Sequence, residues 1–333
     1  MSISLAAATT VAAIAAVTTT AATTAATAAT TQPAPGDADL LLAAIVAAAV
    51  LTVAFFVGSF RRDSVLGPIR LHESDSPTRV LAIAFLGIGL WMGLAGMYLA
   101  LVHGTEITAA RQGGLEYSMP LRESAILNVC VQLIALVAVV RADQILLQNG
   151  LAKLGFTPRD FPRGFLAGLL GAIVAVPLTF AVSIFVTKLW FVLKFPSPQD
   201  HQLIRLLLEH PDRVARWLAI ASPIVVAPLF EETIFRGHIQ TLIAHSIRRF
   251  RGLARPFDPI EQSDAPWIRW IAICTSAALF AVIHEAGWMM PPLFVLAVCF
   301  GYVYERTGKL WAPIVMHALF NATSIALALF TRG

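Results

Sequence analysis

Charged side chains are scarce in this chain. Asp, Glu, Lys and Arg make up 13% of its residues, whereas roughly 25% is usual in a soluble domain. Hydrophobic residues make up 57%, and several uninterrupted apolar runs approach the roughly 20 residues that cross a bilayer as a helix. These features exclude an ordinary soluble domain. They predict an all-α fold, a polytopic transmembrane helical bundle.

Cysteine is also rare, and no two cysteines lie close together in the sequence. Cys130, Cys274 and Cys299 each lie in an apolar run, which excludes a disulfide framework and a cysteine-rich metal site. The net charge of +4 comes mostly from arginines between the apolar runs. In a membrane protein such charge indicates orientation and contact with lipid headgroups. We therefore expect the lipid bilayer as a partner and no nucleic acid.

The beginning of the chain lacks charge altogether. Residues 1–31 consist mainly of Ala and Thr, without the basic start and Leu-rich middle of a secretory signal. Pro33, Pro35 and Gly36 then interrupt the chain before the first clear apolar run. We expect residues 1–36 to form a low-complexity, disordered arm.

Eight apolar segments follow, and we expect each to be a transmembrane helix. Basic residues gather in the loops after the first, third, fifth and seventh segments, so the positive-inside rule puts these loops in the cytoplasm and the amino terminus outside. We expect an integral, multi-pass protein of the plasma (inner) membrane. The expected spans are residues 40–60, 80–102, 124–140, 164–186, 217–244, 267–284, 291–304 and 311–330.

These segments suggest a division of the chain into regions. The stretch 201–210 has a Leu/Ile face and polar ends, which is typical of a helix lying in the membrane interface. We expect irregular backbone over residues 103–123 and a short charged inner turn over residues 305–309. The expected regions are the arm (1–36), the N-terminal transmembrane helices (37–187), an extramembrane or interfacial segment (188–216) and a C-terminal transmembrane core (217–333).

The fifth span carries charged side chains at the depth of the bilayer. Such groups are costly there, so they tend to face a polar cavity and mark a functional site. Glu232 and Arg236 are four residues apart on one helix face, and we expect them to form an ion pair. Glu231 points about 100° away from Glu232. It has no such partner and is available as a general base.

Two later spans carry polar groups that could meet these charges. One contains Phe280 and His284 a turn apart, and the other contains His317 and Asn321 a turn apart. Each histidine or asparagine alone has a structural explanation, because such residues often bond a neighbouring membrane helix. Polar groups on three separate spans, in a chain with so few, favour one shared site.

The three motifs in order resemble a known family. They follow the pattern EExxxR (Glu231 to Arg236), FxxxH (Phe280 to His284) and HxxxN (His317 to Asn321). This pattern is similar to the CPBP family of intramembrane endopeptidases, which includes type II CAAX prenyl endopeptidases and bacteriocin-processing or immunity proteins. The stretch 305–314 (ERTGKLWAPI) is also like family members. The resemblance covers residues 222–329, and the first half of the chain matches only as generic spans.

The resemblance implies proteolysis at a water-filled cavity within the membrane, on a membrane-embedded or lipidated protein or peptide. It implies that Glu231 takes a proton from water and that His284 orients that water. His317 and Asn321 would stabilise the oxyanion that develops on the scissile carbonyl. Glu232 and Arg236 would support Glu231, with Phe280 beside them.

A metal-dependent mechanism is the alternative for the same residues. Glu231, His284 and His317 could bind zinc, since a catalytic zinc site uses three protein ligands and a water. Asn321 is a poor zinc ligand, and the helical HExxH pattern is absent because Trp288 stands where its second histidine would be. We therefore favour a mechanism without a cofactor, with zinc as the alternative.

Two features of the sequence fit this site less well. Counted from the inner ends of their spans, His317 is shallow and His284 is near the outer end. A common site therefore requires the sixth span to start later, tilt, or break before Gly287 and Pro291. His238 lies two turns after Glu231 on roughly its face, but it matches no motif position.

The leading hypothesis is an intramembrane endopeptidase. A second hypothesis is a non-catalytic membrane protein that binds a peptide or confers immunity, using the same cavity without the chemistry. A third is a transporter in which Glu231 and the histidines relay protons. The chain shows no internal repeat, so a transporter built from repeats gains no support.

Overall fold

The computed structural model describes most of the chain after the arm. It covers residues 35–56, 76–114, 117, 119–147, 150–195, 212–250, 266–284 and 287–332. The expected arm (residues 1–34 of it) and the expected interfacial helix (201–210) lie outside the described residues. Within the described ranges every regular element is helical, which confirms the all-α prediction.

The elements follow one another without a strand in the described part of the chain. They are α2 (Asp37–Phe56), α3 (Pro77–Val102), α4 (Gly104–Gln112), α5 (Leu121–Leu146), α6 (Gly150–Lys153), η1 (Pro158–Asp160), α7 (Phe161–Val192), α9 (Arg213–Ala221), η2 (Ser222–Val226), α10 (Ala227–Glu232), η3 (Thr233–Gln240), α11 (Thr241–Phe250), α12 (Pro266–Ile283), α13 (Met290–Thr307) and α14 (Trp311–Arg332).

Each of the eight segments expected to span the membrane forms helix over most of its described residues. Among the described residues, six helical stretches are long and apolar enough to cross a bilayer: 77–102, 122–146, 158–192, 213–248, 266–283 and 311–330. Helices α2 and α13 occupy the two other expected positions. The arrangement is consistent with about eight spans. The outside amino terminus and the plasma membrane stay predictions from the loop charges.

Local sequence explains where several of these helices begin and end. Proline stands in the first turn of α3, α7 and α13, where its missing N–H costs no helical hydrogen bond. The side chain of Asp212 caps α9 by accepting hydrogen bonds from the backbone of Val214 and Ala215. Gly308 ends α13 with a φ of 66°, a left-handed conformation that favours glycine.

Some predicted boundaries were wrong. The third span extends to Leu146 and the fourth to Val192, because Arg141 and Lys188 interrupt the apolar runs without ending the helices. The stretch 103–123 is not all irregular, since α4 follows directly after α3. Glu305 lies in α13 with 6% of its surface exposed, so it does not belong to an inner turn.

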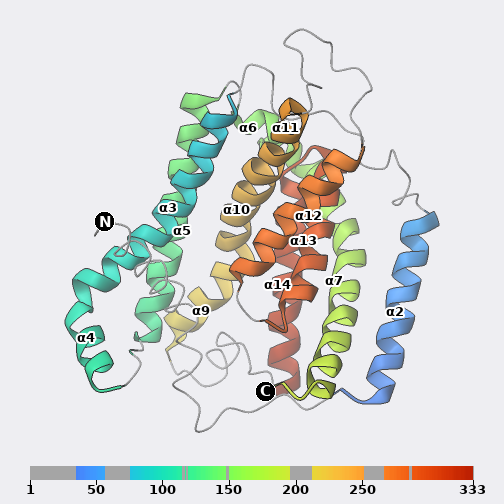
Figure 1. The fold of residues 1–333 in the computed structure, drawn as a ribbon, viewed down its shortest axis with the longest axis horizontal. Helices are drawn as coiled ribbons and strands as arrows, with labels where there is room; N and C mark the ends of the chain where they lie inside the picture. The colour runs from blue at the N-terminus through green and yellow to red at the C-terminus, as the bar shows by residue number, and fades with distance from the viewer. Residues whose placement is uncertain are drawn as a thin grey trace.

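The helices pack around the stretch from α9 to α11, which crosses the middle of the molecule (Figure 1). Helices α3 and α5 lie on one side of it, and α12, α13, α14 and α7 lie on the other, with α2 at the far edge beside α7. One apolar cluster joins α3, α5, η3 and α12 through Ile83, Val139, Ile234 and Phe280. A second joins α7, α13 and α14.

Candidate active site

The charged motif lies at the end of α10, between two π-helical segments. Segment η2 precedes α10 and η3 follows it, so Glu231 and Glu232 occupy the last α-helical turn before the wider π turns begin. π-Helical turns are rare and are frequently found at functional sites. The local backbone therefore marks the same place as the buried charges.

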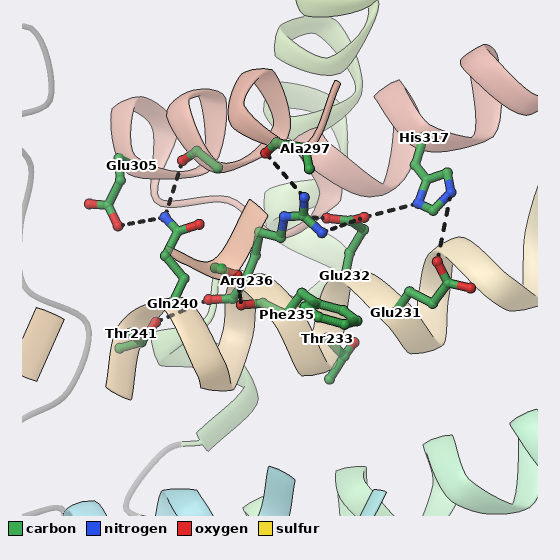
Figure 2. Close-up of polar contacts among 12 residues, drawn as sticks. Glu231, Glu232, Thr233, Phe235, Arg236, Gln240, Thr241, Ala297, Glu305 and His317 are labelled. Carbon is green, nitrogen blue, oxygen red and sulfur yellow. Dashed lines mark hydrogen bonds and ion pairs between the residues drawn. The ribbon is translucent and has the colours of Figure 1, made fainter. Parts of the chain in front are cut away.

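Glu232 and Arg236 form the expected ion pair. Arg236 Nη1 donates to Glu232 Oε1 at 3.1 Å, and Arg236 Nε lies 3.1 Å from Glu232 Oε2. Neither side chain is exposed. Arg236 Nη2 also donates to the Ala297 carbonyl of α13 at 3.1 Å, so the pair joins the motif to α13 (Figure 2).

Aromatic rings enclose the guanidinium of Arg236. Its central carbon lies 4.8 Å from the centre of the Phe280 ring, 5.3 Å from Phe300 and 5.9 Å from Phe235. The imidazole of His317 stacks on Phe300 with ring centres 5.2 Å apart and meets Phe280 edge-on. Aromatic faces stabilise a desolvated cation, so these rings hold Arg236 and His317 in one orientation.

Glu231, His284 and His317 converge from three helices. His284 Nε2 lies 3.6 Å from Glu231 Oε2, and His317 Nε2 lies 3.9 Å from the same oxygen. Figure 2 shows Glu231 and His317 facing each other from α10 and α14. The Glu231 side chain is 14% exposed, His317 6% and His284 31%, so the group opens on the His284 side. Separations beyond about 3.5 Å are suited to a bridging water.

In both histidines, the Nδ1 atom, which faces away from Glu231, makes a hydrogen bond to an oxygen acceptor. His284 Nδ1 donates to the Phe280 carbonyl at 2.7 Å, and His317 Nδ1 donates to Glu232 Oε1 at 2.9 Å. Both partners can only accept, so each Nδ1 carries hydrogen. In the neutral imidazole the Nε2 atoms that face Glu231 then carry lone pairs.

The conflict in depth between His284 and His317 is resolved by the shape of α12. Figure 1 shows α12 running obliquely across the bundle, and the helix ends at Ile283, directly before His284 and ahead of Gly287. His284 thus lies at the end of an oblique helix, where its Nε2 is 3.6 Å from Glu231 Oε2. A tilted span and a break before Gly287 were among the ways in which a common site had been expected to form, whereas α12 does not start later than expected.

Asn321 has a partner outside this group. Its Nδ2 donates to the Pro223 carbonyl of η2 at 2.7 Å. One of the two amide hydrogens is therefore used to hold η2 against α14. The other remains for a second acceptor.

His238 does not join Glu231. It is 1% exposed, its Nδ1 donates to the Thr233 carbonyl at 2.8 Å, and its Nε2 lies 2.9 Å from Asp143 Oδ1 on α5. The π turns of η3 change the phase of the helix after Thr233, which turns His238 towards α5.

The sequence did not reveal a second polar row along α13. Gln240 Nε2 donates to the Gly301 carbonyl at 3.2 Å and to Glu305 Oε1 at 2.9 Å, and Arg269 Nη1 donates to Glu305 Oε2 at 3.0 Å. Gln240 and Gly301 each lie one turn after Arg236 and Ala297, so this row extends the contact between η3 and α13 by one turn (Figure 2). Gln240 follows Arg236 by four residues, which is the signal that could have identified it.

The described residues contain no group of three or more His, Cys, Asp and Glu side chains arranged to hold a metal ion. Glu231, His284 and His317 are nevertheless of the residue types that bind zinc. The Nδ1 atoms of the two histidines are held by a carbonyl and a carboxylate, as is usual for histidine ligands. The chemistry of these three side chains therefore suits either a water or a metal-bound water.

One comparison with known proteins finds a relationship. Residues 213–323 match the family model described as "Rce1-like: Type II CAAX prenyl endopeptidase Rce1-like". Neither the comparison with curated proteins nor that with solved structures finds a match. The matched segment contains all the site residues expected from the sequence. The segment 213–323 is therefore similar to the Rce1-like family of type II CAAX prenyl endopeptidases.

Proposed function

We propose that this protein is an intramembrane endopeptidase that hydrolyses peptide bonds of membrane-associated proteins or peptides. The observation that carries the proposal is the approach of two histidine Nε2 atoms to one oxygen of Glu231. This carboxylate oxygen is buried and makes no hydrogen bond within the described residues. A family match over the same segment supports hydrolysis as the chemistry.

In the proposed reaction Glu231 is the general base. It takes a proton from a water whose oxygen attacks the scissile carbonyl carbon, and His284 Nε2 orients that water. Glu231 then returns the proton to the amide nitrogen as the carbon–nitrogen bond breaks. Transfer of this kind by a positioned side chain contributes about 10²–10⁴-fold in rate.

The oxyanion would be stabilised from α14. Asn321 has one amide hydrogen left after its bond to Pro223. His317 Nε2 can donate only when the imidazole carries both hydrogens, because its Nδ1 hydrogen is held by Glu232. Glu232 would then act as the counter-ion of that imidazolium. Loss of one oxyanion donor typically costs about 10²–10³-fold in rate.

The proposed substrate class is a peptide that reaches the site from the membrane. The family name refers to prenylated CAAX proteins, and a prenylated peptide is the first substrate to test. An unprenylated peptide of the same sequence distinguishes recognition of the lipid from recognition of the chain.

The test uses the purified protein in lipid nanodiscs with an internally quenched peptide that ends in a prenylated cysteine and three further residues. We expect Glu231→Gln to lower cleavage at least about 10³-fold, because the amide cannot accept the proton. Glu106→Gln is the matched control, since Glu106 lies on α4 outside the site. In cells, the new peptide termini of membrane proteins should disappear in the Glu231→Gln strain. Unchanged cleavage by Glu231→Gln would remove Glu231 as the base.

The same experiment separates the other hypotheses. A binding or immunity protein would keep its cellular effect in Glu231→Gln, and a proton-coupled transporter would show proton flux in liposomes without peptide cleavage. Chelation decides between the metal-free and zinc mechanisms. Cleavage that is lost with a chelator and restored by added zinc would assign Glu231, His284 and His317 as ligands.

A further inference from the structure

A second buried acid–histidine pair lies beside the glutamate motif. Asp143 of α5 and His238 of η3 are 0% and 1% exposed, and they meet through His238 Nε2 and Asp143 Oδ1 at 2.9 Å. They are separated by 95 residues along the chain. Neither side chain contacts Glu231, and neither has a part in the reaction proposed above.

The contacts of His238 show how many hydrogens the pair holds. Nδ1 faces the Thr233 carbonyl at 2.8 Å, and a carbonyl can only accept. Nδ1 therefore carries hydrogen. The contact between Nε2 and Asp143 Oδ1 needs one more hydrogen, on whichever side it resides. The pair as a whole is neutral, which is the state that burial in an apolar surrounding favours.

The pair reaches the glutamates through the backbone of η3. Thr233 is the first residue after Glu232, and the bond from His238 to its carbonyl spans five residues. Two neighbouring carbonyls of η3 also accept side-chain hydrogen bonds: Phe235 from Ser276 at 3.1 Å and Arg236 from Thr241 at 3.1 Å. Side chains thus bond three carbonyls of the wide π turns, two from the same helical stretch and one from α12. His238 bonds the carbonyl that lies nearest to the two glutamates along the chain.

We infer that Asp143 and His238 are positioning residues, which fix the π turn at Thr233 and thereby aim Glu231 at its two histidines. Asp143 orients the imidazole, and His238 Nδ1 holds the carbonyl. This inference rests on the proposed function. A misplacement of about 1 Å far from the chemistry can cost about 10²-fold in rate, so the bond to Thr233 has a measurable effect.

The test compares near-isosteric variants of the two residues with the prenylated quenched peptide in nanodiscs. His238→Gln puts a nitrogen near Asp143 and loses the bond to Thr233, so we expect kcat to fall about 10–100-fold with KM within about threefold of wild type. Asp143→Asn can donate to His238 Nε2 and should keep at least about one third of kcat. Asp143→Leu cannot orient the imidazole and should lower kcat about tenfold or more.

A variant that only loosens packing provides the structural control. Thr179→Val removes a buried hydroxyl of α7 that bonds its own helix. We expect it to lower the melting temperature without changing kcat per active site. Hydrogen exchange over residues 229–240 gives a readout that needs no substrate. It should be faster in Asp143→Leu than in Asp143→Asn.

The outcomes separate the two claims. If Glu231→Gln is inactive while His238→Gln and Asp143→Leu have wild-type kcat, the positioning role is wrong and the proposed function stands. If Glu231→Gln cleaves at the wild-type rate, the assignment of Glu231 as the base fails, and if the wild-type protein cleaves no peptide, the proposed function fails, whatever the other variants do. An Asp143→Asn protein that does not fold, or equal exchange over 229–240 in both Asp143 variants, would also overturn the positioning role.

Discussion

The six candidate spans differ in how much of them is buried. In each of the three spans between residues 213 and 330, 44% of an apolar stretch of 18 residues is buried inside the protein, whereas the share is 22% in each of the three spans between residues 77 and 192. The described helices after residue 212 also bury ionisable side chains: Glu232, Arg236, His238, Arg269, Glu305 and His317. Among the described residues of α2 to α7, Asp143 is the buried carboxylate. Its partner, His238, belongs to the later spans.

The two groups of helices differ in the kind of side chain that they expose and enclose. The earlier helices expose apolar side chains to lipid, as Leu101 and Ile145 do with 77% and 79% of their surface. The later helices need their polar groups enclosed, because an unpaired charge in hydrocarbon is costly. Enclosure requires neighbours on all sides, so the earlier helices serve as part of the wall around the site.

The largest expected effect comes from breaking an enclosed pair. Arg236→Met leaves Glu232 buried without its cation, and removal of one partner of a buried pair destabilises by about 3–5 kcal/mol. We expect a large loss of melting temperature and of cleavage. The double variant Glu232→Gln/Arg236→Met carries no orphaned charge and should regain most of the stability. Thermal unfolding in detergent measures both. Equal stability of the single and double variants would show that the charge is not enclosed.

A smaller effect is expected where the wall meets the core. A Cβ atom added at Gly168 of α7 would lie 2.6 Å from the Ala312 carbonyl oxygen and 2.7 Å from Val315 Cβ of α14. Overpacking of this kind costs about 1–3 kcal/mol, so Gly168→Ala should lower the melting temperature. It should also lower cleavage, because α14 carries His317.

Gly89 of α3 is the matched control for Gly168. A Cβ atom added there meets nothing within 4 Å. Gly89→Ala should raise stability by up to about 1 kcal/mol through helix propensity. Equal melting temperatures for Gly168→Ala and Gly89→Ala would contradict the view that α7 packs tightly against α14 at Gly168 while α3 is unpacked at Gly89.

The sequence predicted the pairing of residues along one helix, and its three motifs predicted that groups from three helices share a site. The pairing of Glu232 with Arg236 follows from their spacing, because an α-turn brings residues four apart together. The eight helical segments follow from apolar run lengths. The three motifs predicted a shared site, and Glu231, His284 and His317 converge.

Contacts that depend on packing between helices could not be predicted. Counting residues along α12 placed His284 at the end of its span, where it lies, but could not predict how the direction of that helix brings it to Glu231. The π turns of η3 changed the direction of His238, and no local pattern announces such turns. Asp143 was missed because its partner lies 95 residues later. Glu305 was read as a loop charge, although Gln240 and Arg269 enclose it.

The smallest expected effect concerns the polar group outside the enclosed core. His103 follows α3 directly, with Nδ1 2.9 Å from Glu106 Oε2 on α4 and Nε2 2.8 Å from Glu123 Oε1 on α5. The hydrogen bond to Glu123, followed by that to Glu106, raises the pKa of His103 above its ordinary 6.5. The hydrogen bond to His103 lowers the pKa of Glu106 below its ordinary 4.5.

These pKa shifts define a pH range in which the contacts of His103 attach α4 most strongly to the rest of the protein. A raised histidine pKa contributes stability that is fully present below pH 6.5 and is lost as the pH rises through the folded value. A lowered glutamate pKa contributes stability that is present above pH 4.5 and is lost as the pH falls through the folded value. The attachment of α4 is therefore strongest between these two values and weakens on the alkaline side as His103 loses its proton.

A spin label on α4 measures this attachment. With the three native cysteines replaced by alanine, a label at Ala109→Cys should become more mobile as the pH rises from 6 to 9. The same label in a His103→Gln background should show mobility that does not change over this range, because glutamine does not titrate. Equal pH dependence in both proteins would assign the change to another group. At each pH, cleavage by the His103→Gln protein should match that of the protein with His103 intact, since α4 lies outside the enclosed core.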